Sequence, residues 1–203
     1  MIAIISGSSR TNSNTYKVAQ AIKRLCQQFG YVEKDILVPD FTQYDIPFHN
    51  GGEVNKSNLS AFQNELYTAL SRAEMIFMLT PEYNWFPSAE MINFVNQFGS
   101  GEFSDCWNGK LFATCGISNG RGGRIPAVQL SYVLNKLINV LDYHSVVSPK
   151  MFESQFTSKA LDVQGNSLGN EEYDKGLEKF VRYNLDLLQK IHPGLNSGNE
   201  KPQ

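Results

Sequence analysis

Apolar and polar residues follow one another in blocks along this chain, and the blocks predict strands and helices in turn. Short, wholly apolar runs at residues 2–5 and 75–79 are typical of strands that are buried on both faces of a parallel sheet. Longer stretches with apolar residues three and four positions apart, as in residues 18–29, predict helices with one buried face. The chain therefore reads as strands and helices in alternation.

The same patterns place each element. Strands are expected at residues 2–5, 32–38, 75–79, 111–116 and 146–147, and helices at residues 14–29, 59–72, 88–98, 126–141 and 173–191. Residues 40–57 and 152–169 are rich in turn formers and are expected to be loops. Residues 1–191 are predicted to form a single domain, and residues 192–203 a mobile C-terminal tail.

This alternation predicts an α/β fold. Five strands joined by helices favour a parallel sheet with right-handed crossovers and helices on both faces, which is a three-layer αβα sandwich. Five such strands match the flavodoxin-like arrangement with strand order 2-1-3-4-5. In that order the carboxyl ends of strands 1, 3 and 4 meet at one edge of the sheet, where ligands bind in open α/β sheets.

The first of the loops expected at that edge is residues 6–15, SGSSRTNSNT, which enters a helix N-terminus. Free N–H groups, the helix dipole and the hydroxyl groups favour an anion there, and a terminal phosphate is the obvious guest. Arg10 adds a planar charged donor. The loop is neither GxxxxGK[ST] nor GxGxxG. A capped helix start with solvated serines is the alternative.

The second loop, residues 80–84, follows a strand that Pro81 ends, and it carries Glu82, Tyr83 and Asn84. With Trp85 and Phe86 it suits a planar ring with polar edges; a polar surface turn is the alternative. The third loop, residues 118–123, is SNGRGG, whose glycines let the backbone approach a flat ligand closely, unless the loop is merely flexible. A phosphate at one end and a large planar ring at the other describe flavin mononucleotide (FMN).

Three segments carry a resemblance to a known family: GSSRTNSNTYKVA (residues 7–19), LTPEYNWFPSAEMINFVNQF (79–98) and WNGKLFATCGISNGRGG (107–123). In this order and spacing they resemble the NADPH-dependent FMN reductase family, which includes quinone, azo and chromate reductases. The family usually has small residues after the second loop, where this chain has Trp85 and Phe86, and a lysine where it has Ile92.

The resemblance implies a set of cofactor-binding residues. Those implied for the phosphate are Ser8, Arg10, Ser13, Asn14 and Thr15. Those implied around the flavin ring are Pro81, Glu82, Tyr83, Asn84 and Trp85 on one side and Ser118, Asn119, Gly120, Gly122 and Gly123 on the other. No catalytic side chain and no metal ligand is expected, because the flavin carries the chemistry.

The implied activity is an FMN-dependent NAD(P)H oxidoreductase. Hydride would pass from NADPH or NADH to the flavin and then to a small acceptor: a quinone, free flavin, an azo or nitro compound, or a metal oxyanion. The resemblance also implies a homodimer or homotetramer. Two alternatives remain: a flavodoxin-like electron-transfer module that does not itself oxidise NADPH, and a regulatory domain that senses flavin.

Composition narrows the class of protein. A formal net charge of −2 gives no reason to expect nucleic acid or an acidic membrane as a partner. No apolar run approaches the roughly 18 residues of a membrane span, and no basic leader precedes the first strand. Cys26, Cys106 and Cys115 lack metal-ligand spacing, which fits reduced thiols in the cytoplasm.

Overall fold

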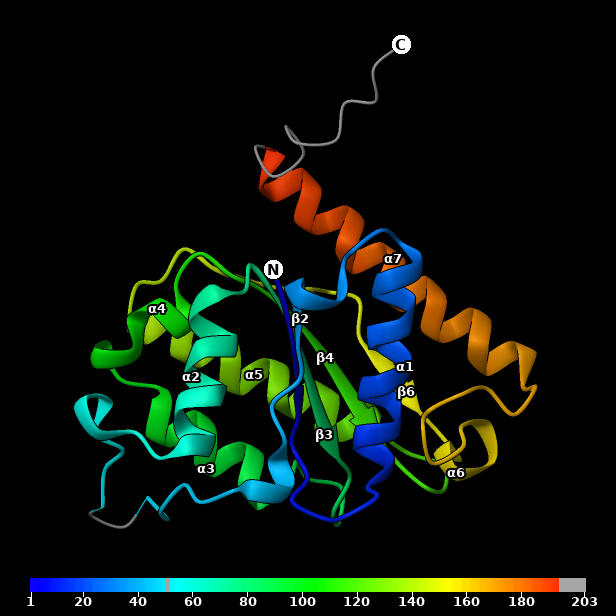
Figure 1. The fold of residues 1–203 in the computed structure, drawn as a ribbon, viewed down its shortest axis with the longest axis horizontal. Coiled ribbons are helices and arrows are strands. Elements are labelled where there is room, and N and C mark those ends of the chain that lie inside the picture. Colours follow the sequence, from blue (N-terminus) through cyan, green and yellow to red (C-terminus); the bar gives the residue numbers. More distant parts are fainter. Residues whose placement is uncertain (50–51, 194–203) are drawn as a thin grey trace.

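A parallel sheet forms the centre of the molecule in the computed structural model, which describes residues 1–49 and 52–193. The strands are β1 (Ile2–Ser6), β2 (Ile36–Leu37), β3 (Met75–Pro81), β4 (Leu111–Ile117), β5 (Val146–Val147) and β6 (Phe152–Ser154). Their order is β2-β1-β3-β4-β5, with β6 also paired to β4 (Figure 1). The predicted order and the α/β class are confirmed.

Helices cover both faces of the sheet (Figure 1). The α-helices are α1 (Asn14–Gln28), α2 (Ala61–Arg72), α3 (Ala89–Phe98), α4 (Ser104–Trp107), α5 (Arg124–Val140), α6 (Thr157–Ala160) and α7 (Glu171–Ile191). Short 3₁₀ helices are η1 (Glu33–Asp35), η2 (Phe41–Gln43), η3 (Lys56–Asn58) and η4 (Gly101–Phe103). α1, α6 and α7 pack on one face and α2, α3, α4 and α5 on the other, which gives the three predicted layers.

The core explains why the central strands are almost wholly apolar. Successive side chains of a strand point to opposite faces, so Ile2 and Ile4 of β1 enter one apolar cluster while Ala3 and Ile5 enter the other. Every residue of β1, β3 and β4 is buried. A strand that is covered on both faces carries apolar residues at nearly every position.

The second strand is shorter than predicted. Residues 32–38 were expected to be extended, but Glu33–Asp35 form a 3₁₀ turn and only Ile36–Leu37 pair with β1. The turn closes through the Asp35 N–H, which donates to the Val32 carbonyl oxygen at 2.9 Å. Three consecutive charged residues have no buried surface to join at this edge of the sheet.

The loop predicted at residues 152–169 is wrong in its first part, because it contains β6 and α6. β5 pairs with Leu111 and Phe112 at the start of β4, whereas β6 pairs with Cys115 to Ile117 at its end. The two short strands thus share the fifth position of the sheet, and the segment containing Pro149 separates them. Since proline cannot donate to the ladder, it breaks this edge strand in two.

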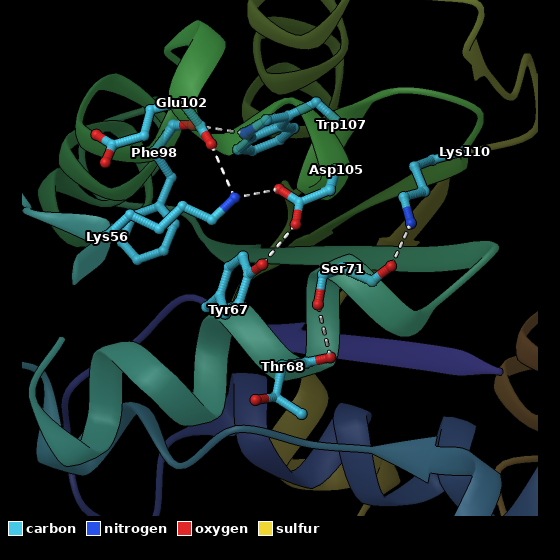
Figure 2. A network of polar contacts seen from close by, with 9 residues as sticks. All are labelled: Lys56, Tyr67, Thr68, Ser71, Phe98, Glu102, Asp105, Trp107 and Lys110. Atoms are coloured by element: carbon cyan, nitrogen blue, oxygen red, sulfur yellow. Dashed lines mark hydrogen bonds and ion pairs between the residues drawn. The ribbon is translucent and has the colours of Figure 1, made fainter. Parts of the chain in front are cut away.

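Lys56 is one of several side-chain links between the long loop that joins β2 to α2 and the helical layer; Asn93 and Gln97 of α3 also bond this loop. The Lys56 ammonium donates to the Glu102 carbonyl oxygen at 2.8 Å and to the Asp105 carboxylate at 3.0 Å, and Tyr67 donates its hydroxyl to the same carboxylate at 2.5 Å. Figure 2 shows Lys56 between these groups, with Lys110 bonded separately to the Ser71 carbonyl oxygen at 2.9 Å. We refer to Lys56, Tyr67 and Asp105 as the Lys56 clamp.

α7 is the last helix among the described residues, and its last residue, Ile191, agrees with the predicted helix end. Residues 194–203 of the predicted tail lie outside the described residues. Among the described helices, none is both long enough and apolar enough to cross a membrane.

Candidate functional site

The three polar loops meet at the carboxyl edge of the sheet and enclose a pocket of about 380 Å³. Its lining residues come from β1–α1, from the end of β3 and from the end of β4. They are Ser8, Arg10, Thr11, Asn12, Ser13, Asn14, Thr15, Pro81, Glu82, Tyr83, Ile117 and Asn119. The volume lies within the roughly 300–1,000 Å³ of small-molecule sites.

The first end of the pocket is the N-terminus of α1. Ser13 caps the helix by accepting a hydrogen bond from the Tyr16 N–H at 3.1 Å. The N–H groups of Asn14 and Thr15 have no carbonyl one turn earlier within the helix, so they are free to bind a ligand. No acidic side chain lies in this first turn to compete for them.

Thr15 is the most informative residue here. Its side chain is 1% exposed, it lines the pocket, and its hydroxyl has no hydrogen-bond partner among the described residues. A buried hydroxyl without a partner costs about 1–3 kcal/mol. A hydroxyl without a partner at a helix N-terminus is available to an anionic ligand.

Tyr83 forms another wall. Its hydroxyl lies 3.4 Å from the Ser8 hydroxyl, so it reaches from the end of β3 to the loop after β1. The Arg10 guanidinium carbon lies 4.9 Å from the Tyr83 ring centroid, a cation–π contact. Arg10 thus borders the pocket from above the tyrosine ring.

The residues after Tyr83 form a tight hairpin. Tyr83 and Phe86 exchange N–H···O bonds of 3.0 Å in both directions, and the two residues between them have positive φ, 51° for Asn84 and 66° for Trp85. This is the backbone of a type I′ turn. Asn84 and Trp85 were predicted to line the flavin ring, but neither is among the pocket's lining residues, and Trp85 is 69% exposed.

The glycine loop is held by Glu82. The Glu82 N–H donates to the Ile117 carbonyl oxygen at 2.8 Å, and the Glu82 carboxylate accepts a hydrogen bond from the Gly123 N–H at the start of α5. A Cβ atom on Gly122 would lie 2.5 Å from that carboxylate. Glu82 therefore joins the second loop to the third, a role that the sequence did not reveal.

Two glycines allow the end of β4 and the glycine loop to lie close together. Gly123 has a φ of 89°, and a Cβ atom on Gly116 would lie 1.8 Å from the Gly123 carbonyl oxygen. Asn119 joins the same loop to α1, because its side-chain oxygen accepts from the Asn14 amide at 3.3 Å. Ser118, Gly120, Gly122 and Gly123 do not line the pocket, and Ser118 instead pairs with Ser154 of β6 at 2.8 Å.

Three lining residues were not predicted: Thr11, Asn12 and Ile117. Asn12 has a φ of 54°, and asparagine tolerates this left-handed conformation better than most residues. The position of Asn12 between two polar residues of the first loop could have indicated that it lines the pocket. Ile117 was missed because the fourth strand runs one residue further than residues 111–116.

Cysteine and metal chemistry find little support in the geometry. All three cysteines are free and buried. Burial raises the pKa of the Cys26 and Cys106 thiols to about 12 and raises that of Cys115 too, so all three stay protonated at neutral pH. Within residues 1–49 and 52–193, no three His, Cys, Asp or Glu side chains gather in a way that could hold a metal ion.

Comparison with known families now decides the assignment. The family model described as NADPH-dependent FMN reductase matches residues 1–158. The chain belongs to this family. FMN is therefore its cofactor and NAD(P)H its electron donor, which makes the protein an FMN-dependent NAD(P)H oxidoreductase.

Solved structures share the fold of this FMN reductase. FerB, a flavoenzyme NAD(P)H:(acceptor) oxidoreductase from Paracoccus denitrificans, is 20% identical over 94% of this chain and 97% of its own, with a TM-score of 0.67. The NADH:FMN oxidoreductase EMOB, in its apo form, is 20% identical over 90% of this chain and 88% of its own, with a TM-score of 0.53. A flavodoxin from the domain Archaea is 15% identical over 95% of this chain and 99% of its own, with a TM-score of 0.56. No curated protein matches the chain in sequence.

Proposed function

We propose that this FMN reductase holds FMN in the pocket between the three loops and passes electrons from NAD(P)H to a small acceptor. The acceptor would be a quinone, free flavin, an azo or nitro compound, or a metal oxyanion. The observation that carries the proposal is the buried Thr15 hydroxyl, which lines the pocket at the N-terminus of α1 without a partner.

The N-terminus of α1 suits the FMN phosphate. Ser8 and Ser13 are buried at the pocket and Thr15 has a hydroxyl to donate, while the helix dipole attracts negative charge. Arg10 stands at the rim with a planar cation that can pair with phosphate oxygens. All of them belong to the set that the resemblance implies for the phosphate.

Other residues that line the pocket suit a ring. Pro81 and Tyr83 supply apolar and aromatic surface, and Asn119 supplies an amide that can face the polar edge of a flavin. Glu82 acts as a positioning residue, because its carboxylate fixes the Gly123 N–H and with it the glycine loop. Asn84, Gly120 and Gly122 would then shape the site through the backbone.

When bound, FMN supplies the hydride-accepting and electron-donating chemistry. In the overall reaction, NAD(P)H, one proton and a two-electron acceptor are converted to NAD(P)⁺ and the reduced acceptor. The side chains named here bind, orient and exclude water, and we assign none of them as an acid, base or nucleophile.

Assembly and location follow as proposals. α5 leaves Ile125, Tyr132 and Val140 exposed, which supports a homodimer or homotetramer. α3 offers less exposed apolar surface, since it buries Met91, Phe94 and the other apolar residues of its face and Ile92 is half-buried. Three free, buried cysteines are consistent with the cytoplasm.

Turnover with the FMN-loaded protein tests the proposal. NADPH oxidation should be slow alone and accelerate with at least one acceptor from a panel of a benzoquinone, an azo dye, free FMN and chromate. Flavin binding without NADPH oxidation in any mixture would contradict it, and would favour the electron-transfer or flavin-sensing alternatives.

A further inference from the structure

Two large aromatic side chains project from the hairpin beside the pocket. Trp85 is 69% exposed and Phe86 is 62% exposed, and they directly follow Tyr83, which lines the pocket. We call Trp85 and Phe86 the aromatic tip. Exposed aromatic surface next to a binding pocket is a contact surface available to a second ligand.

The backbone of the aromatic tip is strained. Asn84 and Trp85 have φ of 51° and 66°, where a type I′ turn favours asparagine followed by glycine. A tryptophan in the left-handed region is rare, and such outliers concentrate at ligand sites where the surroundings hold them in place. Two more non-glycine residues with positive φ border this site: Asn12, which lines the pocket, and Phe156, whose N–H donates to the Gly120 carbonyl oxygen at 3.0 Å.

The surroundings do hold the hairpin at both ends. Before it, Tyr83 lies against Ser8 and Arg10. After it, the Ser88 hydroxyl donates to the Gly7 carbonyl oxygen at 2.5 Å and the Ser88 N–H donates to the Thr80 hydroxyl at 3.0 Å. The residues on both sides of the aromatic tip are thus bonded to the segments that surround the pocket.

We propose that the aromatic tip selects the electron acceptor: a flat aromatic acceptor of the quinone class stacks against Trp85 while it is reduced. A small inorganic oxyanion gains nothing from such a surface, whereas a planar ring gains both apolar burial and ring stacking. This inference rests on the proposed function, and it narrows the acceptor from the wider group to planar aromatic compounds.

The reaction is balanced for a quinone. NAD(P)H gives up a hydride, and the quinone finally gains two electrons with one proton from that hydride and one from water. The products are NAD(P)⁺ and the hydroquinone. Trp85 takes no part in these transfers and only positions the ring.

Three variants test the aromatic tip in the FMN-loaded protein. Trp85→Phe keeps an aromatic ring and Trp85→Leu removes it, and both keep a β-carbon at the strained position. Phe48→Leu is the control, because Phe48 is 71% exposed and lines none of the described pockets. Each variant is assayed with a water-soluble benzoquinone and with ferricyanide, an inorganic anion.

We expect kcat/KM for benzoquinone to fall about fivefold or more in Trp85→Leu and to stay near the wild-type value in Trp85→Phe. The ferricyanide rate, the KM for NADPH and all values for Phe48→Leu should not change. An equal loss for both acceptors, or no loss in Trp85→Leu, would overturn the inference. A lower oligomeric mass of Trp85→Leu by light scattering would also overturn it, because the aromatic tip would then be a subunit contact.

Fluorescence gives a second readout that needs no turnover. The chain has two tryptophans, and Trp107 is fully buried, so emission from an exposed indole reports on Trp85. Anthraquinone-2-sulfonate without NADPH should quench wild-type emission saturably, and should quench Trp85→Leu only linearly or not at all. If NADPH oxidation is absent altogether, the proposed function fails, while this titration still decides whether the aromatic tip binds a flat ring.

Discussion

At the scale of single residues, two buried threonines differ in whether they line the pocket. Thr15 and Thr114 are 1% and 0% exposed, and neither hydroxyl has a partner among the described residues. Thr15 lines the pocket at the start of α1, whereas Thr114 lies in the middle of β4. Only the first hydroxyl is placed to bind a ligand.

Replacing Thr15 by valine should therefore have opposite effects on stability and binding. Removal of an unpartnered buried hydroxyl should raise the free energy of unfolding of the FMN-free protein by about 1 kcal/mol. Loss of a hydrogen bond to a charged phosphate should weaken FMN binding about tenfold or more. Urea unfolding and a fluorescence titration of FMN measure the two quantities.

Thr114→Val is the matched control. It should stabilise the protein to a similar extent and leave FMN affinity unchanged. If Thr15→Val bound FMN as tightly as the wild type, the phosphate would lie elsewhere.

At the scale of elements, the site depends on how closely β4 and the start of α5 approach. Gly116→Ala would place a methyl group 1.8 Å from the Gly123 carbonyl oxygen, so the glycine loop must move. We expect a loss of about 1–3 kcal/mol in the free energy of unfolding and weaker FMN binding. Gly101→Ala, where no heavy atom lies within 4 Å of the added Cβ, should change neither quantity in urea unfolding and FMN titration.

The Lys56 clamp should make the stability of the folded protein depend on pH. Burial alone would raise the pKa of Asp105, but the hydrogen bonds from Tyr67 and Lys56 and the Lys56 charge outweigh it, so the pKa lies below its ordinary value of 3.8. A carboxyl group with a lowered folded-state pKa contributes stability above its unfolded pKa, and that contribution is lost as the pH falls through the folded pKa.

The difference in unfolding free energy between the wild type and Asp105→Asn should therefore be constant above about pH 5 and shrink below about pH 4. Urea unfolding from pH 3 to pH 7 measures it. A difference that grows on acidification would show that the Lys56 clamp does not act through the Asp105 charge.

Much of this architecture could be predicted because the central strands are buried on both faces and leave continuous apolar runs. At the edges the prediction succeeded only in part: β5 has its predicted residues 146–147, whereas β2 is shorter than predicted and β6 was not predicted. β6 has three residues, Phe152 to Ser154, too few for any period, and it forms only because the end of β4 offers unpaired backbone groups. Glu33 to Asp35 follow a β-branched residue but turn back in a 3₁₀ helix.

The site followed the same division. A polar loop before a helix predicted residues that do line the pocket, because a helix N-terminus offers free N–H groups to an anion. The Glu82 carboxylate could equally have faced a ligand, and only the three-dimensional position of Gly123 assigns it to the glycine loop. The exposed position of Trp85 depends on a type I′ turn. The pair Asn-Gly predicts such a turn from sequence, whereas the pair Asn-Trp does not.

At the scale of the whole molecule, α5 presents three large apolar side chains to solvent. Tyr132 is 69% exposed, and Ile125 and Val140 lie on the same side of the helix at 45% and 58%. Tyr132→Glu should turn a dimer or tetramer into monomers, because a charge in an apolar interface must be desolvated. Light scattering measures the mass, and Tyr183→Glu on α7 serves as the control, with no expected change.

The most direct measurement is the absorbance spectrum of the purified, FMN-loaded protein before and after anaerobic addition of NADPH. The account predicts that FMN remains with the protein through gel filtration, that its yellow absorbance bleaches on NADPH addition, and that it returns when an acceptor is added. A protein that retains no FMN at micromolar concentration, or whose bound FMN keeps its oxidised spectrum with excess NADPH and NADH, would contradict the account.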